Sequence, residues 1–209
     1  MFGERGLTFR EFLMREPLPL ATIQEAVLEF LRDRDDALLF GAPAVNAYVE
    51  EPRMTQDVDI LSTRAAELAV ELRNLLGARF HIAVRVREVA EGRGYRLLHV
   101  RKPEDRHLVD VRSVEALPPA ERLKGVLVVT PAELVAGKVI AFHKRRGRPE
   151  PGTDWRDLAL LLLKFPALRS HPGPVDDRLI AAGADPAVFD TWRELAAQEI
   201  LPEGDDDGF

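Results

Sequence analysis

The chain has 209 residues, of which 46% are hydrophobic and 31% charged, a composition typical of a globular protein with a sizeable core. Its formal net charge of −6 argues against a generic nucleic-acid binder, because such proteins are usually basic. The absence of cysteine excludes disulfides, thiol nucleophiles and cysteine-ligated zinc, and no apolar run reaches the roughly 18 residues of a membrane helix. We therefore expect a cytoplasmic protein without a signal peptide or membrane contact.

The first part of the chain mixes helices and strands. Thr22, followed by Glu25 three residues later, is typical of a helix start and predicts a helix over residues 23–34. A short apolar strand at 37–40 ends at Gly41, and Pro43 favours a helix directly after it. Further elements are expected as a strand at 57–62, a helix at 64–77 that stops at Gly77, a strand at 80–89, a hairpin formed by 95–102 and 107–113, and a strand at 125–130.

The character of the chain changes at Thr130, after which only helices are predicted. Thr-Pro-x-Glu at 130–133 combines an N-cap, a proline at the first helical position and a glutamate at the third. The expected fold class is therefore α+β (α/β), with a mixed-sheet core over 1–129, a helical lobe over 130–202 and a flexible tail over 203–209. The helices of the lobe are predicted at 130–146, 153–165, 175–183 and 186–200.

Two aspartates interrupt an apolar strand. Asp57 and Asp59 lie two residues apart, so their side chains share one face about 6.5 Å apart. Asp110 has similar surroundings, and if its strand is a neighbour, three carboxylates converge on one spot. Three such anions need a cation, and Mg²⁺ is the natural one because it prefers oxygen ligands. Taken alone, however, an Asp-x-Asp pair is more often a strand end or a solvated face.

A glycine separates the strand at 37–40 from the following helix. This arrangement leaves free backbone N–H groups at a helix N-terminus, which favour phosphate. Pro43 lacks an N–H group, so a phosphate site would depend on Gly41, Ala42 and the residues after Pro43. The pattern is neither a Walker A loop nor a dinucleotide fingerprint, and a glycine in this place is usually only a turn.

Together these features resemble the nucleotidyltransferase superfamily of the DNA polymerase beta type, and most closely its branch of AbiEii-like and minimal nucleotidyltransferases, many of which are toxins. The resemblance covers about residues 36 to 165 and includes the run of Lys, Arg and Asp-x-x-Asp in the second lobe. It implies a mixed-sheet nucleotidyltransferase core followed by a helical lobe. The matching positions of the first lobe are Gly41, Ala42, Arg53, Thr55, Asp57, Asp59 and Asp110.

The resemblance also implies roles for these residues. Asp57 and Asp59 would hold the metal ions that bind a nucleoside triphosphate, while Asp110 would hold the second metal and help to deprotonate the attacking hydroxyl. The backbone N–H groups of Gly41 and Ala42 would bind the β- and γ-phosphates. Many members have serine or glycine in place of Ala42, and the serine hydroxyl would add a phosphate contact that alanine lacks.

Other positions keep two interpretations each. Thr55 either hydrogen-bonds near the acids or is an ordinary strand residue, and Arg53 either binds phosphate or pairs with Glu50. Lys138 either extends along its helix to solvent or reaches the nucleotide, as the family pattern favours. Asp157 lies one helical turn from Asp154, and its role would be indirect: it would hold the side chain of Lys138 or of an arginine in place.

The remaining polar and aromatic residues suggest no site. The basic cluster HKRRGR at 143–148 either faces phosphate or lies at a helix C-terminus, where cations are favoured. The histidines show no metal-ligand spacing and are expected on surfaces or strand faces, and the tryptophans are expected to be packing residues. These are His81, His99, His107, His143, His171, Trp155 and Trp192.

The predicted function is Mg²⁺-dependent transfer of a nucleoside monophosphate from a nucleoside triphosphate such as ATP, with two metal ions. The acceptor would be a hydroxyl of RNA, of a protein or of a small molecule, and the family branch adds a toxin that has an antitoxin protein as its partner. Two alternatives stay open at this point: a catalytically weak module that binds a nucleotide or a partner protein, and a metal-dependent phosphohydrolase that uses the same acids.

Overall fold

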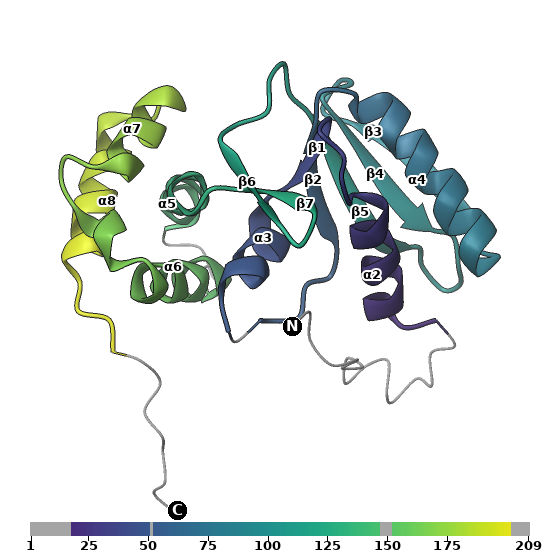
Figure 1. Cartoon of the computed structure of the whole chain (residues 1–209), viewed down its shortest axis with the longest axis horizontal. Coiled ribbons are helices and arrows are strands. Elements are labelled where there is room, and N and C mark those ends of the chain that lie inside the picture. The colour runs from purple at the N-terminus through teal and green to yellow at the C-terminus, as the bar shows by residue number, and fades with distance from the viewer. Residues whose placement is uncertain (1–17, 51, 147–151, 202–209) are drawn as a thin grey trace, which may run out of the picture. The chain divides into compact units, whose positions relative to one another are not determined.

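The computed structural model of the chain describes residues 18–50, 52–146 and 152–201. Between Val129 and Thr130 the chain divides into two compact units, the first built on a sheet and the second helical (Figure 1). The α+β prediction is therefore confirmed. The tail predicted at 203–209 and the end of the basic cluster at 143–148 lie outside the described residues.

A seven-stranded mixed sheet forms the first unit, in the order β3-β4-β5-β2-β1-β7-β6. The pairs β2–β5 and β1–β7 are parallel, and the other neighbours are antiparallel. The predicted hairpin is present as β4 and β5. The strands are β1 (Ala37–Leu39), β2 (Val58–Ser62), β3 (Val84–Val89), β4 (Gly94–His99), β5 (Arg106–Ser113), β6 (Ala120–Leu123) and β7 (Val126–Val129).

Three helices in the described part of the first unit cover this sheet. Helices α2 (Leu20–Phe30) and α4 (Ala65–Phe80) lie on one side of it, and α3 (Gly41–Tyr48) lies on the other (Figure 1). Helix α4 contacts β3, β4 and β5, whereas α3 contacts β2 and β7. The core on the α4 side is fully buried and contains Ile60, Leu68, Leu72, Leu76, Leu97, Val109 and Val111.

Three local predictions in the first unit were wrong or incomplete. Helix α2 begins at Leu20 with Pro19 as its N-cap residue, so Thr22 lies inside the helix. Helix α4 continues through Gly77 and ends before His81, whose left-handed backbone (φ 53°) takes the place expected for the glycine. A glycine costs a helix only about 1 kcal/mol, which the burial of Leu72 and Leu76 readily offsets. Strand β6 was not predicted.

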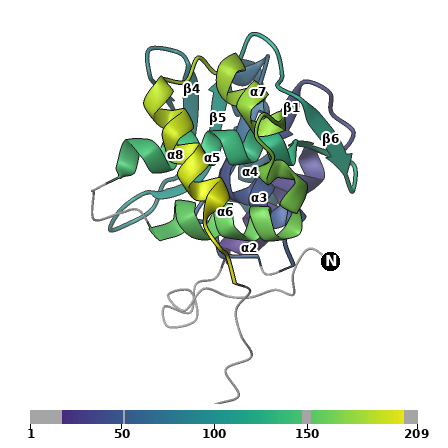
Figure 2. The ribbon, with the colours of Figure 1, turned by 90° about the vertical axis from the view of Figure 1, so that its left-hand side faces the viewer.

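The second unit consists of helices in its described part. Helix α5 contacts each of the other three α-helices (Figure 2), and a short 3₁₀ helix, Pro166–Arg169, follows α6. Trp192 is fully buried, which confirms its expected packing role. None of the described helices combines the length and the apolar character needed to cross a membrane. The four helices are α5 (Pro131–Arg145), α6 (Gly152–Lys164), α7 (Pro174–Ala181) and α8 (Pro186–Ala197).

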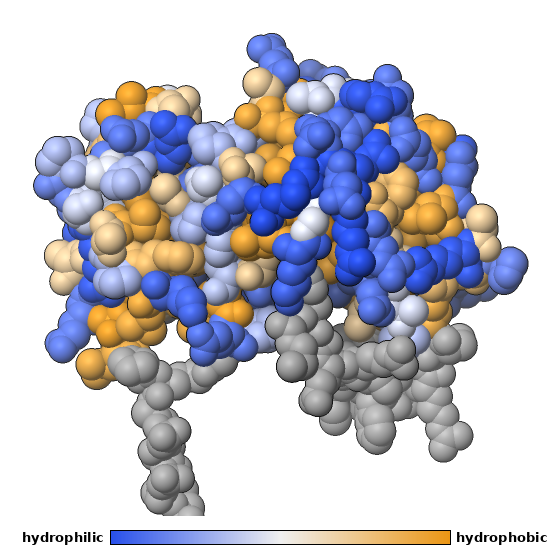
Figure 3. Space-filling model, in the orientation of Figure 1, coloured by the Kyte–Doolittle hydropathy of each residue, from blue (hydrophilic) through white to orange (hydrophobic). Residues whose placement is uncertain are grey.

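Large hydrophobic side chains that remain exposed are scattered over the described elements. Figure 3 shows hydrophobic residues in several separate groups on the viewed face, between hydrophilic ones. Since the exposed residues belong to different loops and helices, the charged and polar side chains are the better guide to function. The exposed residues are Met54, Val70, Val100, Leu163, Ile180 and Leu201.

Candidate active site

Two of the three predicted aspartates are directly paired in the sheet. Asp59 in β2 lies opposite Asp110 in the parallel strand β5, and paired residues of neighbouring strands point to the same face. Asp57 immediately precedes β2, two residues before Asp59. The alternating residues Val58 and Ile60 are buried on the other face, which fixes the register and keeps the acids away from the core.

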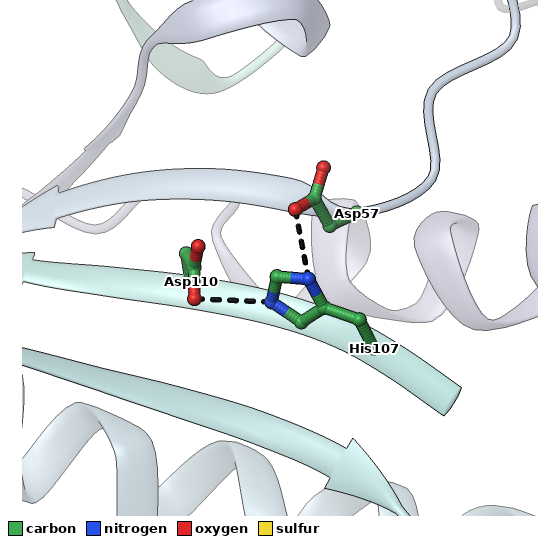
Figure 4. A group of neighbouring side chains, drawn as sticks. All are labelled: Asp57, His107 and Asp110. Carbon is green, nitrogen blue, oxygen red and sulfur yellow. Dashed lines mark hydrogen bonds and ion pairs between the residues drawn. The ribbon is translucent and has the colours of Figure 1, made fainter. Parts of the chain in front are cut away.

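A histidine lies between two of these acids. His107 Nδ1 is 3.1 Å from Asp57 Oδ2, and His107 Nε2 is 3.0 Å from Asp110 Oδ1 (Figure 4). One nitrogen or oxygen atom from each of the three side chains lies within 4.8 Å of the others, close enough for a shared cation. His107 is on a strand face, as expected, but its place between two of the acids was not predicted.

A β-bulge explains how His107 reaches this face. In the β4–β5 pair, Leu97 lies opposite Val109 but the next residue, Leu98, lies opposite His107, so Leu108 is an extra residue in β5. Such a bulge interrupts the alternation of side chains between the two faces. Leu108 and Val109 are accordingly both buried although they are adjacent. His107 thereby lies on the same side as Asp110, three residues later.

Arg96 in β4 holds the carboxylate of Asp110 from the other side. Its Nε and Nη2 atoms donate to the two oxygens of Asp110 at 3.0 and 3.2 Å, a fork-shaped charge-assisted pair. Burial raises the pKa of Asp110, but hydrogen bonds from His107 and Arg96 outweigh it and lower the pKa from 3.8 to about 2. Asp110 is thus a carboxylate anion at physiological pH, suited to holding a cation.

Gly41 lies directly against Asp59. A Cβ atom at Gly41 would overlap Asp59 Oδ2 and lie 3.0 Å from its Cγ, and the backbone of Gly41 is left-handed (φ 65°). Both facts require glycine at the start of α3. Beside this turn, the guanidinium of Arg112 lies 4.7 Å from the ring centre of Phe40, the residue before Gly41.

The loop between α3 and β2 is held by two amide side chains. Asn46 of α3 donates to the carbonyl of Arg53 at 2.7 Å and accepts from its N–H at 3.1 Å. Gln24 of α2 donates to both the carbonyl and the hydroxyl of Thr55, each at 3.0 Å. These contacts fix the loop that leads into Asp57, and they show a structural use for Thr55.

Lys138 is a residue of helix α5 in the second unit, and its side chain reaches helix α6. Its Nζ atom donates to Asp157 at 2.6 Å and to Asp154 at 3.4 Å, and Arg145 binds the other oxygen of Asp154. Asp157 is fully buried and Asp154 is 3% exposed. Asp154 lies inside the first turn of α6.

The first unit therefore brings four groups together: the acids, His107, Arg96 and the glycine turn. Carboxylate oxygens fit Mg²⁺, and the imidazole nitrogen of His107 adds a ligand that softer divalent ions accept. The sequence analysis missed Arg96 and His107. Arg96 could have been found from its position in the strand predicted to pair with the strand of Asp110. No sequence signal marks the bulge that brings His107 to the face of the acids.

The model of the family described as "Nucleotidyl transferase AbiEii toxin, Type IV TA system" matches residues 23–182. No curated protein sequence matches the chain.

Solved structures share the fold at low sequence identity. The Megavirus polyadenylate synthase matches with a TM-score of 0.58 and 13% identity over 76% of this chain, which spans only 34% of that protein. JHP933 from Helicobacter pylori matches with a TM-score of 0.50 and 12% identity, covering 91% of this chain and 90% of that one. The antibiotic-resistance factor ANT(2'')-Ia matches with a TM-score of 0.51 and 16% identity, covering 80% and 91%.

Proposed function

Because the chain belongs to the family of AbiEii nucleotidyltransferase toxins of type IV toxin–antitoxin systems, we propose that it transfers a nucleoside monophosphate from a nucleoside triphosphate to a hydroxyl group. The observation that carries the proposal is the direct pairing of Asp59 with Asp110, beside Asp57 and against the Gly41 turn. This arrangement offers a cation site and a phosphate site next to each other, as phosphoryl transfer requires.

The donor set fits the expected metal ions. Asp57, Asp59 and Asp110 provide carboxylate oxygens, which Mg²⁺ prefers, and we propose that they hold two such ions. Bound there, Mg²⁺ would neutralise the triphosphate and stabilise the charge that develops on the transferred phosphoryl group.

The chain's own groups bind and orient the substrate. The backbone N–H groups of Gly41 and Ala42, at the start of α3, are proposed to bind the β- and γ-phosphates, since a helix N-terminus favours anions. Arg53 and Thr55, in the loop held by Asn46 and Gln24, and Lys138 are proposed to contact the nucleotide. Asp157 is proposed to orient Lys138, whose Nζ atom it binds.

Two partners follow from this function. A nucleoside triphosphate is the donor substrate, and family membership supports an antitoxin protein as the second partner. The acceptor is a hydroxyl group of RNA, of a protein or of a small molecule, and catalysis would come mainly from positioning and electrostatics.

The test is transfer of label from an α-labelled nucleoside triphosphate to cell-extract RNA, protein and small molecules, with Mg²⁺ present. We expect label on an acceptor with the wild type and a loss of about 100-fold or more in Asp57→Ala. Asp105→Ala, which removes a half-buried carboxylate paired with Arg85 in the same unit, is the matched control. Equal transfer by wild type and Asp57→Ala would overturn the proposal, and release of free phosphate without any labelled acceptor would indicate a phosphohydrolase instead.

A further inference from the structure

We propose that Tyr48 is a positioning residue of the phosphate site, whose hydroxyl anchors the C-terminal end of α3 and thereby places the N–H groups of Gly41 and Ala42 at the other end of the helix. The inference rests on the proposed function above and adds to it a residue that does not touch the substrate. Three features of α3 carry it: its small apolar contact, the partners of the Tyr48 hydroxyl and the shortness of the helix.

Helix α3 is held by little apolar contact. It has eight residues, of which only Ala44 and Val45 are buried. Helices shorter than about 12–15 residues are marginal without tertiary contacts, and the side chains of alanine and valine offer little area for such contacts. Within the described part of the chain, no side chain caps the N-terminus of α3 by a hydrogen bond. Polar contacts elsewhere in the helix therefore have a large share in fixing its position.

The polar side-chain contacts of α3 lie in its second half. Besides Asn46, which binds the backbone of Arg53, they come from Tyr48, the last residue of the helix. The Tyr48 hydroxyl lies 2.9 Å from the carbonyl oxygen of Val129 and 2.6 Å from Oε1 of Glu121. Val129 ends β7 and Glu121 lies in β6, and these two strands pair with each other. Tyr48 therefore ties α3 to the β6–β7 hairpin.

The hydroxyl of Tyr48 is a permanent donor. It carries one proton and meets two acceptors, but both acceptors belong to the same hairpin, so the tie exists whichever of them takes the proton. Burial and, after it, the carboxylate of Glu121 raise the pKa of Tyr48 above its ordinary value of 10. The hydroxyl thus keeps its proton at physiological pH, and the anchor does not depend on pH in that range.

The shortness of α3 connects this anchor to the phosphate site. Eight residues at 1.5 Å rise each span about 12 Å, and a helix of this length moves as a rigid element. A change at Tyr48 therefore shifts or tilts Gly41 and Ala42 as well. At that end there is no spare room, since a Cβ atom at Gly41 would overlap Asp59 Oδ2. Small displacements of positioning groups have large effects on a site of this kind.

A positioning role makes a selective prediction about ligands. The N–H groups of Gly41 and Ala42 are proposed to bind the β- and γ-phosphates, which a nucleoside monophosphate lacks. Loss of the Tyr48 anchor should therefore weaken the binding of a triphosphate and spare that of a monophosphate. A merely structural role has a different effect, because a lower folded fraction changes the stoichiometry of binding for every ligand and the Kd of none in particular.

The test compares Tyr48→Phe with Tyr95→Phe in the full chain, which has no third tyrosine. Tyr95 is also half-buried, but its hydroxyl makes no hydrogen bond within the described residues, and it lies opposite Val111 on the face away from the acids. Calorimetry in the presence of Mg²⁺ measures the Kd of inorganic tripolyphosphate, ATP and AMP for each protein. Tripolyphosphate reports on the phosphate site without any contribution from a base.

We expect Tyr48→Phe to weaken the binding of tripolyphosphate and of ATP about fivefold, the size of one lost hydrogen bond, while the Kd of AMP changes by less than about twofold. Tyr95→Phe should match the wild type for all three ligands. In steady-state transfer, Tyr48→Phe should raise the KM for ATP about fivefold and change kcat by less than about twofold, as expected when equal binding energy is lost from the ground state and the transition state.

Two results would overturn the inference. One is an unchanged Kd of tripolyphosphate in Tyr48→Phe, and the other is an equal loss of affinity for tripolyphosphate, ATP and AMP, which would indicate a general disturbance of the fold. Failure of the proposed function has a different signature. The wild type would then label no acceptor, while the ratio of the Kd values of AMP and tripolyphosphate would still report on Tyr48.

Discussion

The backbone conformation of Gly41 and its close approach to Asp59 both require glycine at this position. Replacing it by alanine forces a side chain onto the carboxylate of Asp59 and places alanine at a φ of 65°. We expect Gly41→Ala to displace Asp59 and to lower kcat/KM for nucleotidyl transfer by about 100-fold, since small displacements of positioning groups have effects of this size. Steady-state kinetics with an α-labelled nucleoside triphosphate measures the loss.

Gly137 supplies the matched control for this substitution. It lies inside α5 with no atom within 4 Å of the position of an added Cβ. Gly137→Ala should therefore leave activity unchanged and raise the free energy of unfolding by about 0.5–1 kcal/mol, because alanine is the better helix former. If Gly41→Ala retained full activity, the close approach to Asp59 would have no catalytic importance.

His107 is expected to determine which divalent ion binds best. Its ring nitrogens lie between Asp57 and Asp110, and an imidazole ligand favours Mn²⁺ over Mg²⁺ compared with an all-carboxylate set. In His107→Asn we expect Mn²⁺ affinity to fall about tenfold with little change for Mg²⁺, measured by calorimetry without nucleotide. His99→Asn, at the end of the neighbouring strand β4, is the control, and an unchanged ratio of the two affinities in His107→Asn would refute the role.

At the scale of elements, α5 and α6 are joined by a buried charged cluster. Asp157 is fully buried and binds Lys138, so Asp157→Ala leaves a largely buried ammonium group with only the longer contact to Asp154. We expect a loss of about 3 kcal/mol in the free energy of unfolding, measured by urea denaturation. The reason is that removing one partner of a buried ion pair leaves the other charge desolvated and without its counter-charge.

Two further variants separate this pairing from simple packing. Lys138→Met combined with Asp157→Leu removes both charges and should recover most of the lost stability. Asp190→Ala, which breaks the exposed pair with Arg193 on α8, should change stability by less than about 0.5 kcal/mol. If the double variant were as unstable as Asp157→Ala, the volume of the side chains and not their charge would explain the loss.

The elements also show which sequence signals are reliable. Strand β2, the β4–β5 hairpin and the helices of the second unit were predicted because apolar periodicity dominates those segments. The end of α4 was predicted wrongly, because the burial of Leu72 and Leu76 outweighs the preference of Gly77 for a helix end. The bulge at Leu108 was not predicted either, since it arises from the pairing of β5 with β4 and leaves no local sequence pattern. The position of His107 beside the acids was missed for the same reason.

At the scale of the whole molecule, strand order decides what the acids can do. Sequence spacing places Asp57 and Asp59 together, but only the parallel pairing of β2 with β5 puts Asp110 beside Asp59. The same order places Arg96 beside Asp110, although 37 residues separate Arg96 from Asp59 along the chain. Long-range pairing of this kind is set by the fold as a whole, so the family pattern predicted the acids while Arg96 became visible only in the structure.

The stability of the whole molecule should depend on pH through the same site. The pKa of Asp110 is lowered to about 2, because hydrogen bonds from His107 and Arg96 outweigh the effect of its burial. Outside this site, the hydrogen bond from Arg34 also lowers the pKa of Asp36. A carboxylate with a lowered folded-state pKa stabilises the fold above its unfolded value of 3.8, and that contribution is lost as the pH falls toward the folded value. For Asp110 it is about 2 kcal/mol, to be lost between about pH 4 and pH 2.

Asp110→Asn isolates this contribution within the acid unfolding of the molecule. The variant keeps the shape of the side chain but carries no charge, so its free energy of unfolding should lie below that of the wild type at pH 7, and the gap should narrow below pH 4. Urea denaturation at a series of pH values measures the gap, with Asp190→Asn as the control for loss of one exposed carboxylate. A gap that stayed constant down to pH 2 would mean that Arg96 and His107 do not hold the Asp110 anion in solution.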